Sequence, residues 1–385
     1  MGMLKILFPI SDFLYILQLE EYETKRYFKT IKRIFWRRNI QKRGKLVWTK
    51  RTKITFWIAL PFCIIFPVIP LWIGIANFVL TPHFENIKAN IQKRAADYFK
   101  EKNKKTKVIA IAGSFGKTTT KNYIYDLVKY NYKTQMIPGN INTPTGIANW
   151  VLINFDPTSE LLIVEVDTYF IGEIRRSLRI TPPDIAILTN IGDQHLERLV
   201  NKKNLTKALN EVFTCAKSDA IKIKNKKSNL EYALEVAKLL DIPKDIVNDT
   251  TKNLQKPDRR GDTKIINGFE VVDESYNISE TTAKLGVDNA LRIAESKQKK
   301  LIVITAGIPE LGEENKNGNK NLGEYLVKNV EKIVLLKSIL YKEVLNSSKK
   351  FILANNLDEA WETLKDYKAK EYLVLLQPEL NDLYY

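Results

Sequence analysis

Cysteine and histidine are scarce in this chain of 385 residues, which has two of each. Cys63 lies in an apolar run and Cys215 lies far from it, so the sequence supplies neither a disulfide framework nor a zinc cluster. Internal repeats are also missing. These absences exclude a disulfide-stapled secreted domain and a repeat array, and they are typical of a protein that works in a reducing compartment. The apolar content of 44% is that of a protein with packed cores.

Acidic residues are missing between Lys25 and Lys53, a stretch with thirteen Lys or Arg residues. The whole chain has a formal net charge of +17, from 61 basic and 44 acidic residues. This one stretch accounts for most of the excess, and the remainder of the chain is nearly balanced. A nucleic-acid-binding surface spread over the protein is therefore excluded, and no nucleic-acid partner is expected.

Charge of either sign is missing from Ile54 to Leu80, a run of 27 residues. A helix of that length would reach ~40 Å, more than the hydrocarbon core of a bilayer, but Pro61, Pro67 and Pro70 interrupt it. Because basic residues flank both ends, and such residues stay in the cytoplasm, we expect a helix-break-helix hairpin, broken near Phe66 to Pro70, that dips into the membrane. This predicts a membrane-associated protein with cytoplasmic catalytic domains and lipid partners. A single span and a buried core helix are the alternatives.

Short apolar runs alternate with helical stretches after Lys107, a pattern typical of an α/β fold with a doubly wound parallel sheet. The expected strands are Val108 to Ala112, Leu161 to Val166 and Ile185 to Thr189. Each is followed by a loop rich in Gly, Thr, Asn or Asp. Such loops, at the carboxyl ends of strands, are where this class of fold binds ligands.

A second, smaller α/β unit is expected from Pro257 onward, where Asn267-Gly268 between apolar flanks predicts a β-hairpin. Three further strands are expected in it: Leu301 to Thr305, Lys332 to Leu336 and Tyr372 to Leu376. The expected division of the chain is a basic and apolar membrane-attachment region (1–100), a central ATP-binding domain (101–256) and a C-terminal domain (257–385).

The first expected strand runs into a loop and a helix with the sequence Gly113-Ser114-Phe115-Gly116-Lys117-Thr118-Thr119-Thr120. Backbone N–H groups of such a loop, together with the N-terminus of the helix, form a concave anion site. Lys117 can neutralise phosphate charge, and the hydroxyl of Thr118 can ligate Mg²⁺. This motif predicts a site for ATP and Mg²⁺.

Four more motifs follow in order along the chain. They are Pro138-Gly139-Asn140-Ile141-Asn142-Thr143-Pro144-Thr145-Gly146, then Leu162-Ile163-Val164-Glu165-Val166-Asp167 with Gly172-Glu173-Ile174, then Pro183-Asp184-Ile185-Ala186-Ile187-Leu188-Thr189-Asn190-Ile191-Gly192-Asp193-Gln194-His195-Leu196-Glu197, and last Arg259-Arg260-Gly261 with Asp273-Glu274-Ser275-Tyr276-Asn277.

Together with the phosphate loop, these motifs resemble the Mur ligase family, and they are closest to its branch that adds D-alanyl-D-alanine. The resemblance covers residues 107 to about 325. It implies a phosphate-loop central domain followed by a Rossmann-like C-terminal domain. It also implies an ATP-dependent ligase that forms amide bonds through an acyl phosphate, in peptidoglycan or related cell-wall peptide synthesis. The substrates would be a muramyl-peptide-like carboxylate, linked to UDP or to a lipid, and an amine.

The resemblance also implies roles for individual residues. The catalytic set is Lys117, Glu165, His195 and Arg260; the nucleotide-binding set is Gly113, Ser114, Gly116, Lys117, Thr118, Thr119, Asn142, Asn190, Asp273 and Asn277; the metal ligands are Thr118, Glu165 and His195. Taken singly, His195 could be structural, Glu165 a solvated strand end, and Asp273 and Asn277 caps of a helix that starts near Glu280. Which of Arg259 and Arg260 points into the site is left open.

Three features depart from the family pattern. The N-terminal domain that holds the UDP-sugar is missing, and the stretch from Phe213 to Asn229 is short. Leu209 stands where the family has a carbamylated lysine that bridges two metal ions, and the nearest lysine is Lys207. Leucine cannot coordinate Mg²⁺. Two alternatives to a cell-wall ligase follow: a degenerate, membrane-anchored nucleotide-binding scaffold or sensor without ligase activity, and a ligase of the same fold that acts on a non-muramyl substrate.

Overall fold

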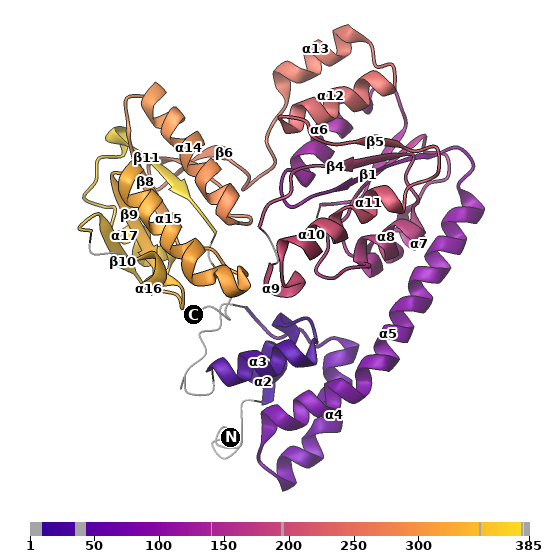
Figure 1. The fold of residues 1–385 in the computed structure, drawn as a ribbon, viewed down its shortest axis with the longest axis horizontal. Coiled ribbons are helices and arrows are strands. Elements are labelled where there is room, and N and C mark those ends of the chain that lie inside the picture. Colours follow the sequence, from indigo (N-terminus) through magenta and orange to yellow (C-terminus); the bar gives the residue numbers. More distant parts are fainter. Residues whose placement is uncertain are drawn as a thin grey trace. The chain divides into compact units, whose positions relative to one another are not determined.

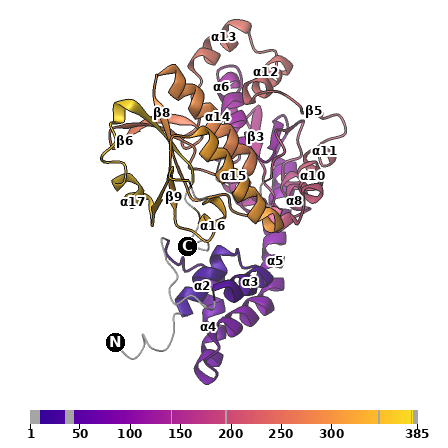
Figure 2. The same ribbon diagram turned by 60° about the vertical axis from the view of Figure 1, so that its left-hand side comes forward.

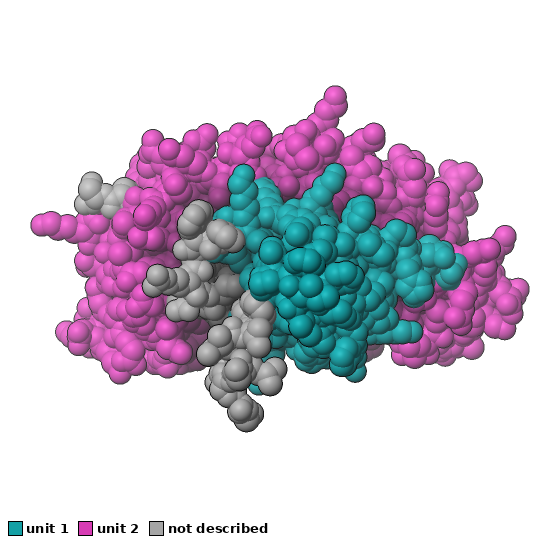
Figure 3. Space-filling view, turned by 90° about the horizontal axis from the view of Figure 1, so that it is seen from below, with its two compact units in different colours: residues 1–90, 380–385 teal, residues 91–379 magenta. Residues whose placement is uncertain are grey.

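The computed structural model describes residues 10–34, 44–139, 141–193, 196–345, 348–378 and 380 (Figure 1). The chain divides into two compact units, residues 1–90 with 380–385 and residues 91–379, which Figure 3 colours separately. The boundary at residue 90 lies inside the long helix α5, which spans Ile69–Lys102.

Helices make up the described part of the first unit. They are α2 (Ile10–Leu19), α3 (Thr24–Ile34), α4 (Lys50–Ile65) and the beginning of α5. Leu14, Tyr27 and Ile73 are fully buried among them. A polar contact crosses this core, because the guanidinium of Arg51 donates a hydrogen bond of 2.7 Å to Asn77 Oδ1.

The expected break between two helices is present, but the predicted membrane attachment is wrong. Among the residues that the structure describes, no helix is long and apolar enough to cross a membrane. The reason is the extended backbone at Phe66, which ends α4 at Ile65. The break divides the uncharged run into two pieces whose helical lengths, about 18 Å each, fall short of the ~30 Å hydrocarbon core. The predicted location and lipid partners therefore lose their support.

A five-stranded parallel sheet is the centre of the first half of the second unit, with the strand order β2-β3-β1-β4-β5. Its strands are β1 (Lys107–Ala112), β2 (Thr134–Met136), β3 (Leu161–Glu165), β4 (Ile185–Leu188) and β5 (Ile221–Ile223). Its helices are α6 (Lys117–Val128), α7 (Pro144–Asn154), α8 (Glu173–Ile180), α9 (Leu196–Leu199), α10 (Lys202–Leu209), α11 (Glu211–Thr214), α12 (Asn229–Leu239) and α13 (Lys244–Asn253).

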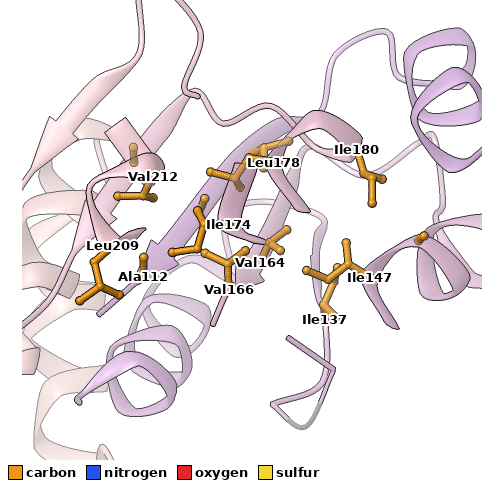
Figure 4. Packing of buried hydrophobic residues seen from close by; sticks show 14 of the residues in the cluster. Ala112, Ile137, Ile147, Val164, Val166, Ile174, Leu178, Ile180, Leu209 and Val212 are labelled. Carbon is orange, nitrogen blue, oxygen red and sulfur yellow. The ribbon is translucent and has the colours of Figure 1, made fainter. Parts of the chain in front are cut away.

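Both faces of this sheet are covered, as the continuous apolar strands require. Successive side chains of β1 point to opposite faces. Ala110 and Ala112 join a core with α7, α8, α10 and α11, part of which Figure 4 shows. Ile109 and Ile111 pack on the other face with α6 and α12. The carboxyl ends of β1, β3 and β4 therefore lie at one edge of a rigid layer.

The second sheet has six strands in the order β10-β9-β8-β11-β7-β6, all parallel except the β6–β7 hairpin. The strands are β6 (Asp262–Ile266), β7 (Phe269–Asp273), β8 (Lys300–Thr305), β9 (Lys332–Leu336), β10 (Phe351–Ala354) and β11 (Tyr372–Leu376). Asn267 and Gly268, both with positive φ, form the expected two-residue turn.

Helices α14 (Glu280–Ser296) and α15 (Asn315–Asn329) lie side by side against the second sheet (Figure 2). Shorter helices complete this half: η1 (Gly312–Glu314), α16 (Tyr341–Val344), α17 (Leu357–Glu362) and η2 (Ala369–Glu371). The α/β fold with two largely parallel sheets, predicted from the sequence, is confirmed.

Candidate active site

The loop between β1 and α6 is held rigidly in place. Gly113 and Gly116 have φ values of 148° and 84°, a backbone region that favours glycine. A Cβ atom at Gly113 would lie 2.0 Å from the hydroxyl oxygen of Thr189, so no side chain fits there. The backbone N–H of Ser114 donates to Asn190 O at 2.8 Å, which ties the loop to the residues after β4.

This loop has the features of a phosphate site. The N-terminal end of α6 has no side-chain cap, because Gly116 occupies the capping position, and its free N–H groups with the helix dipole favour an anion. The hydroxyl of Ser114 is buried and has no hydrogen-bond partner among the described residues. A buried hydroxyl without a partner is costly, and a phosphate oxygen would satisfy it. The residues present therefore fit a nucleotide phosphate.

Lys117 begins α6 and turns back toward the loop. Its ammonium donates to Gly113 O at 2.6 Å and lies 3.3 Å from a carboxylate oxygen of Asp167. The side chain is largely buried, with 8% exposed. The positive charge is thus fixed at the place where the loop would hold phosphates.

Glu165 ends β3 and meets the hydroxyl of Thr118, which lies 3.0 and 2.9 Å from its two oxygens. The strand register brings Glu165 close to Thr118, because Glu165 pairs with Ile111 near the end of β1, and β1 leads through the loop into the start of α6. Carboxylate and hydroxyl oxygens are the hard donors that Mg²⁺ prefers, and Mg²⁺ usually keeps water and phosphate as its other ligands. These two residues therefore fit Mg²⁺, although no group of three His, Cys, Asp or Glu residues gathers in the described part of the chain.

Lys121 is a functional candidate that the sequence analysis missed. It is fully buried; its ammonium lies 3.1 Å from a Glu165 oxygen and donates to Ile137 O at 3.1 Å. Burial lowers the pKa of Lys121, the charge of Glu165 opposes this, and the charge of Arg260 lowers it further. The available signal was its spacing, since a residue one turn after Lys117 on α6 faces the same way.

The structure distinguishes the two neighbouring arginines. Arg259 donates hydrogen bonds to Ser275 Oγ at 2.9 Å and to Ser275 O at 3.0 Å, so it holds the loop after β7. The guanidinium of Arg260 lies 3.8 Å from the ring centroid of Tyr276. The charge of Arg260 also lowers the pKa of Lys121, so Arg260 is the better candidate for a phosphate contact, and that role stays a prediction.

Asp273 and Asn277 do not cap α14. That cap is Ser279, whose hydroxyl accepts from the N–H of Thr282. Asp273 is buried; burial raises the pKa of its carboxyl, but bonds from Lys264 and Ser275 outweigh this and hold the pKa below its ordinary value. Asn277 is exposed and accepts from the N–H of Ile278 at 2.8 Å.

The carboxyl of Glu274 is the other unusual acid of this loop. Burial raises its pKa to about 7, against the charge of Lys256, and the charge of Asp273 raises it further. Its oxygens lie against two glycines, because a Cβ atom would stand 2.2 Å from Oε2 at Gly286 and 3.3 Å from Oε1 at Gly261.

The remaining predicted residues are placed as follows. Thr119 is buried in α6, Asn142 accepts the N–H of Asp167 at 3.2 Å through its backbone oxygen, and Asn190 contacts the loop through its backbone. His195 lies outside the described residues, so its metal role stays a prediction.

Leu209 and Lys207 lie on different sides of α10. Leu209 is buried in the core beside Ala112 and Val212 (Figure 4). Lys207 is exposed and, two residues earlier at ~100° per residue, lies on the opposite side of α10. The suggestion that Lys207 replaces the missing ligand from another face of the helix therefore gains no support and stays a prediction.

Comparison with known proteins gives a family match for part of the chain. Residues 111–279 match the Mur ligase middle domain. A UDP-N-acetylmuramoyl-tripeptide–D-alanyl-D-alanine ligase of Bacillus subtilis is 33% identical over 133 residues, 34% of this chain and 28% of that protein. A UDP-N-acetylmuramoylalanine–D-glutamate ligase of Clostridium acetobutylicum is 29% identical over 148 residues, 38% of this chain and 30% of that protein. The chain thus spans less than a third of the length of these curated relatives.

Solved structures show the same fold over a larger part of the chain. MurF ligase from Thermotoga maritima, in complex with ADP, covers 76% of this chain and 80% of its own, with a TM-score of 0.68 and 22% identity. FolC from Escherichia coli, also with ADP, covers 76% of this chain and 91% of its own, with a TM-score of 0.55 and 12% identity. The resemblance to the Mur ligase family therefore holds in sequence for the middle domain, residues 111–279, and in fold over a larger part of the chain.

Proposed function

We propose that this chain, which carries a Mur ligase middle domain, is an ATP-dependent ligase that joins a carboxylate to an amine. The observation that carries the proposal is the cluster at the ends of β1 and β3, where Lys117, Thr118 and Glu165 meet at a phosphate loop. The names of the matched relatives support a cell-wall peptide as the carboxylate substrate and an amino acid or dipeptide as the amine.

The reaction follows from the chemistry of such a site. An oxygen of the substrate carboxylate attacks the γ-phosphorus of ATP, the bond to ADP breaks, and an acyl phosphate forms. The amine nitrogen then attacks the acyl carbon, the bond to phosphate breaks, and the nitrogen loses a proton as the amide forms. In the first step negative charge spreads over the transferred group. Stabilisation of that charge is the main task of the protein.

The chain's own residues supply this stabilisation. Lys117 and the loop N–H groups hold the phosphates, and Arg260 adds a second positive charge from the C-terminal half. Thr118 and Glu165 would hold Mg²⁺, which neutralises phosphate oxygens when bound. The proposal keeps residues 101–256 as the ATP-binding domain and residues 257–385 as the domain that contacts the nucleoside.

A second candidate is a nucleotide-binding scaffold without ligase activity. The observation that favours it is Leu209, because a buried leucine removes the bridging ligand that the family uses. A ligase for a different acid is a third candidate, supported by the fold likeness to FolC. The three candidates differ in which compounds trigger phosphate release.

Phosphate release by the purified full-length chain tests the proposal. ATP and Mg²⁺ are combined with muramyl tripeptide or another carboxylate and with D-alanyl-D-alanine or another amine. We expect release only when both are present. Lys117→Ala should lower the rate at least ~100-fold, whereas Lys129→Ala, at the C-terminal cap of the same helix, removes an ammonium paired with Asp126 and should leave it unchanged. Nucleotide binding without release for any pair would support the scaffold and contradict the ligase.

A further inference from the structure

Asp167 lies at the phosphate loop and has no role in the motifs described above. It follows β3 two residues after Glu165, and its Oδ1 is 3.3 Å from the ammonium of Lys117. The N–H of Thr168 donates to the same oxygen at 2.9 Å, and the N–H of Asp167 itself donates to Asn142 O at 3.2 Å. The carboxylate is therefore held in place, and 18% of the side chain is exposed.

The two carboxylates at the end of β3 take different partners at the start of α6. Glu165 receives the hydroxyl of Thr118, and Asp167 faces Lys117. A phosphate that binds Lys117 thus comes close to the carboxylate of Asp167. Two negative groups at such a distance repel each other unless a cation lies between them. Asp167 consequently opposes a bare nucleotide and favours one that brings its own cation.

Because this chain lacks the family's bridging ligand, a second carboxylate near Glu165 would be useful for holding Mg²⁺. Leu209 fills the place of that ligand with an apolar side chain, so α10 offers no charged oxygen to the metal. Mg²⁺ is bound through one or two carboxylates together with phosphate oxygens. In the described part of the chain, Glu165 and Asp167 are the acids that contact Thr118 and Lys117 of the loop.

We propose that Asp167 changes partner when the nucleotide binds. In the empty site its carboxylate pairs with Lys117; with the nucleotide in place, Lys117 turns to the phosphates and Asp167 interacts with the accompanying Mg²⁺, directly or through a coordinated water. Asp167 is then a residue that makes the site selective for the magnesium complex of the nucleotide. This inference rests on the proposed nucleotide site but not on the identity of the acid or the amine.

Binding of a fluorescent ADP analogue, measured with Mg²⁺ and with EDTA, tests the inference without catalysis. The variant is Asp167→Asn, which keeps the shape and removes the charge. The matched control is Asp156→Asn, because Asp156 pairs with Lys133 on the surface before β3, at the other end of that strand. A thermal melt of each variant checks that it is folded.

We expect Asp167→Asn to bind the analogue more tightly than the wild type in EDTA, because the competitor for Lys117 is gone. The gain in affinity on adding Mg²⁺ should fall by roughly tenfold, and Asp156→Asn should behave as the wild type. Equal affinities in both media for Asp167→Asn and wild type, or an equal loss in both, would overturn the inference while leaving the nucleotide site intact. Failure of the wild type to bind would overturn the proposed function as well.

Discussion

Glu274 gives a stability prediction whose size follows from the structure. Its pKa is raised by burial from 4.5 to about 7, so the folded protein holds this proton more tightly than the unfolded chain does. Ionisation of the buried carboxyl therefore destabilises the folded state. This effect is absent below about pH 4.5, grows between about pH 4.5 and 7, and is complete above about pH 7. At ~1.4 kcal/mol per pH unit it amounts to roughly 3 kcal/mol.

The perturbation is Glu274→Gln, which mimics the protonated acid at every pH. At pH 8 the variant should be more stable than the wild type by up to roughly 3 kcal/mol, and at pH 5 the difference should fall below about 1 kcal/mol. Hydrogen exchange of β7 and β11 is the suitable assay, because the N–H of Glu274 donates to Leu376 O at 2.9 Å and local opening there is measured directly. Up to ~100-fold slower exchange at pH 8 is expected.

Glu270 on β7, the strand that Glu274 directly follows, is the matched control, because its environment has the opposite effect. Lys297 and Lys299 hold the pKa of Glu270 below its ordinary value, so its ionised form stabilises the fold at neutral pH. Glu270→Gln should therefore exchange as fast as the wild type or faster at pH 8. The reasoning is refuted if Glu274→Gln exchanges at the wild-type rate at pH 8, or if both variants change in the same direction.

Two further substitutions test contacts near the site. Lys121→Met leaves the carboxylate of Glu165 buried without its ion pair and should cost about 3 kcal/mol, seen as a lower melting temperature. Lys129→Met, at the half-buried C-terminal cap of the same helix, should cost less than ~1 kcal/mol; equal effects would contradict the buried pair. Gly286→Ala places a Cβ atom 2.2 Å from Glu274 Oε2 and should destabilise by about 1 kcal/mol. In a Glu274→Ala background the same change should stabilise the protein by up to ~1 kcal/mol. Chemical denaturation measures the change in unfolding free energy, and the same sign in both backgrounds would count against a clash between this Cβ atom and Glu274.

Chemistry that lies within one short segment could be predicted from the sequence. The loop from Gly113 to Thr118 needs only a strand, a glycine turn and a helix, and local rules give all three. The break after Ile65 was predictable for the same reason, since prolines act on their own turn of helix. The membrane prediction failed at the next step, because neither described helix beside that break is long and apolar enough to cross a membrane.

Contacts between distant segments could not be predicted in this way. Lys121 faces Glu165 only because β3 pairs with β1. The residues near Lys121 in the sequence do not indicate which strands pair or in which register. Arg259 and Arg260 are chemically alike, and the choice between them depends on Ser275 and the turn at Gly261. Leu209 was visible as a departure, but its place in the core required the packing of α10 against the sheet.

Leu209 also limits the evolutionary routes open to this sequence. A change to lysine would put an ammonium group in the space shared with Ala112 and Val212, and this change would first lower the amount of folded protein. Descendants of this chain are therefore expected to keep the leucine, and new chemistry would arise in the loops after β3 and β4, where substitutions leave the core undisturbed.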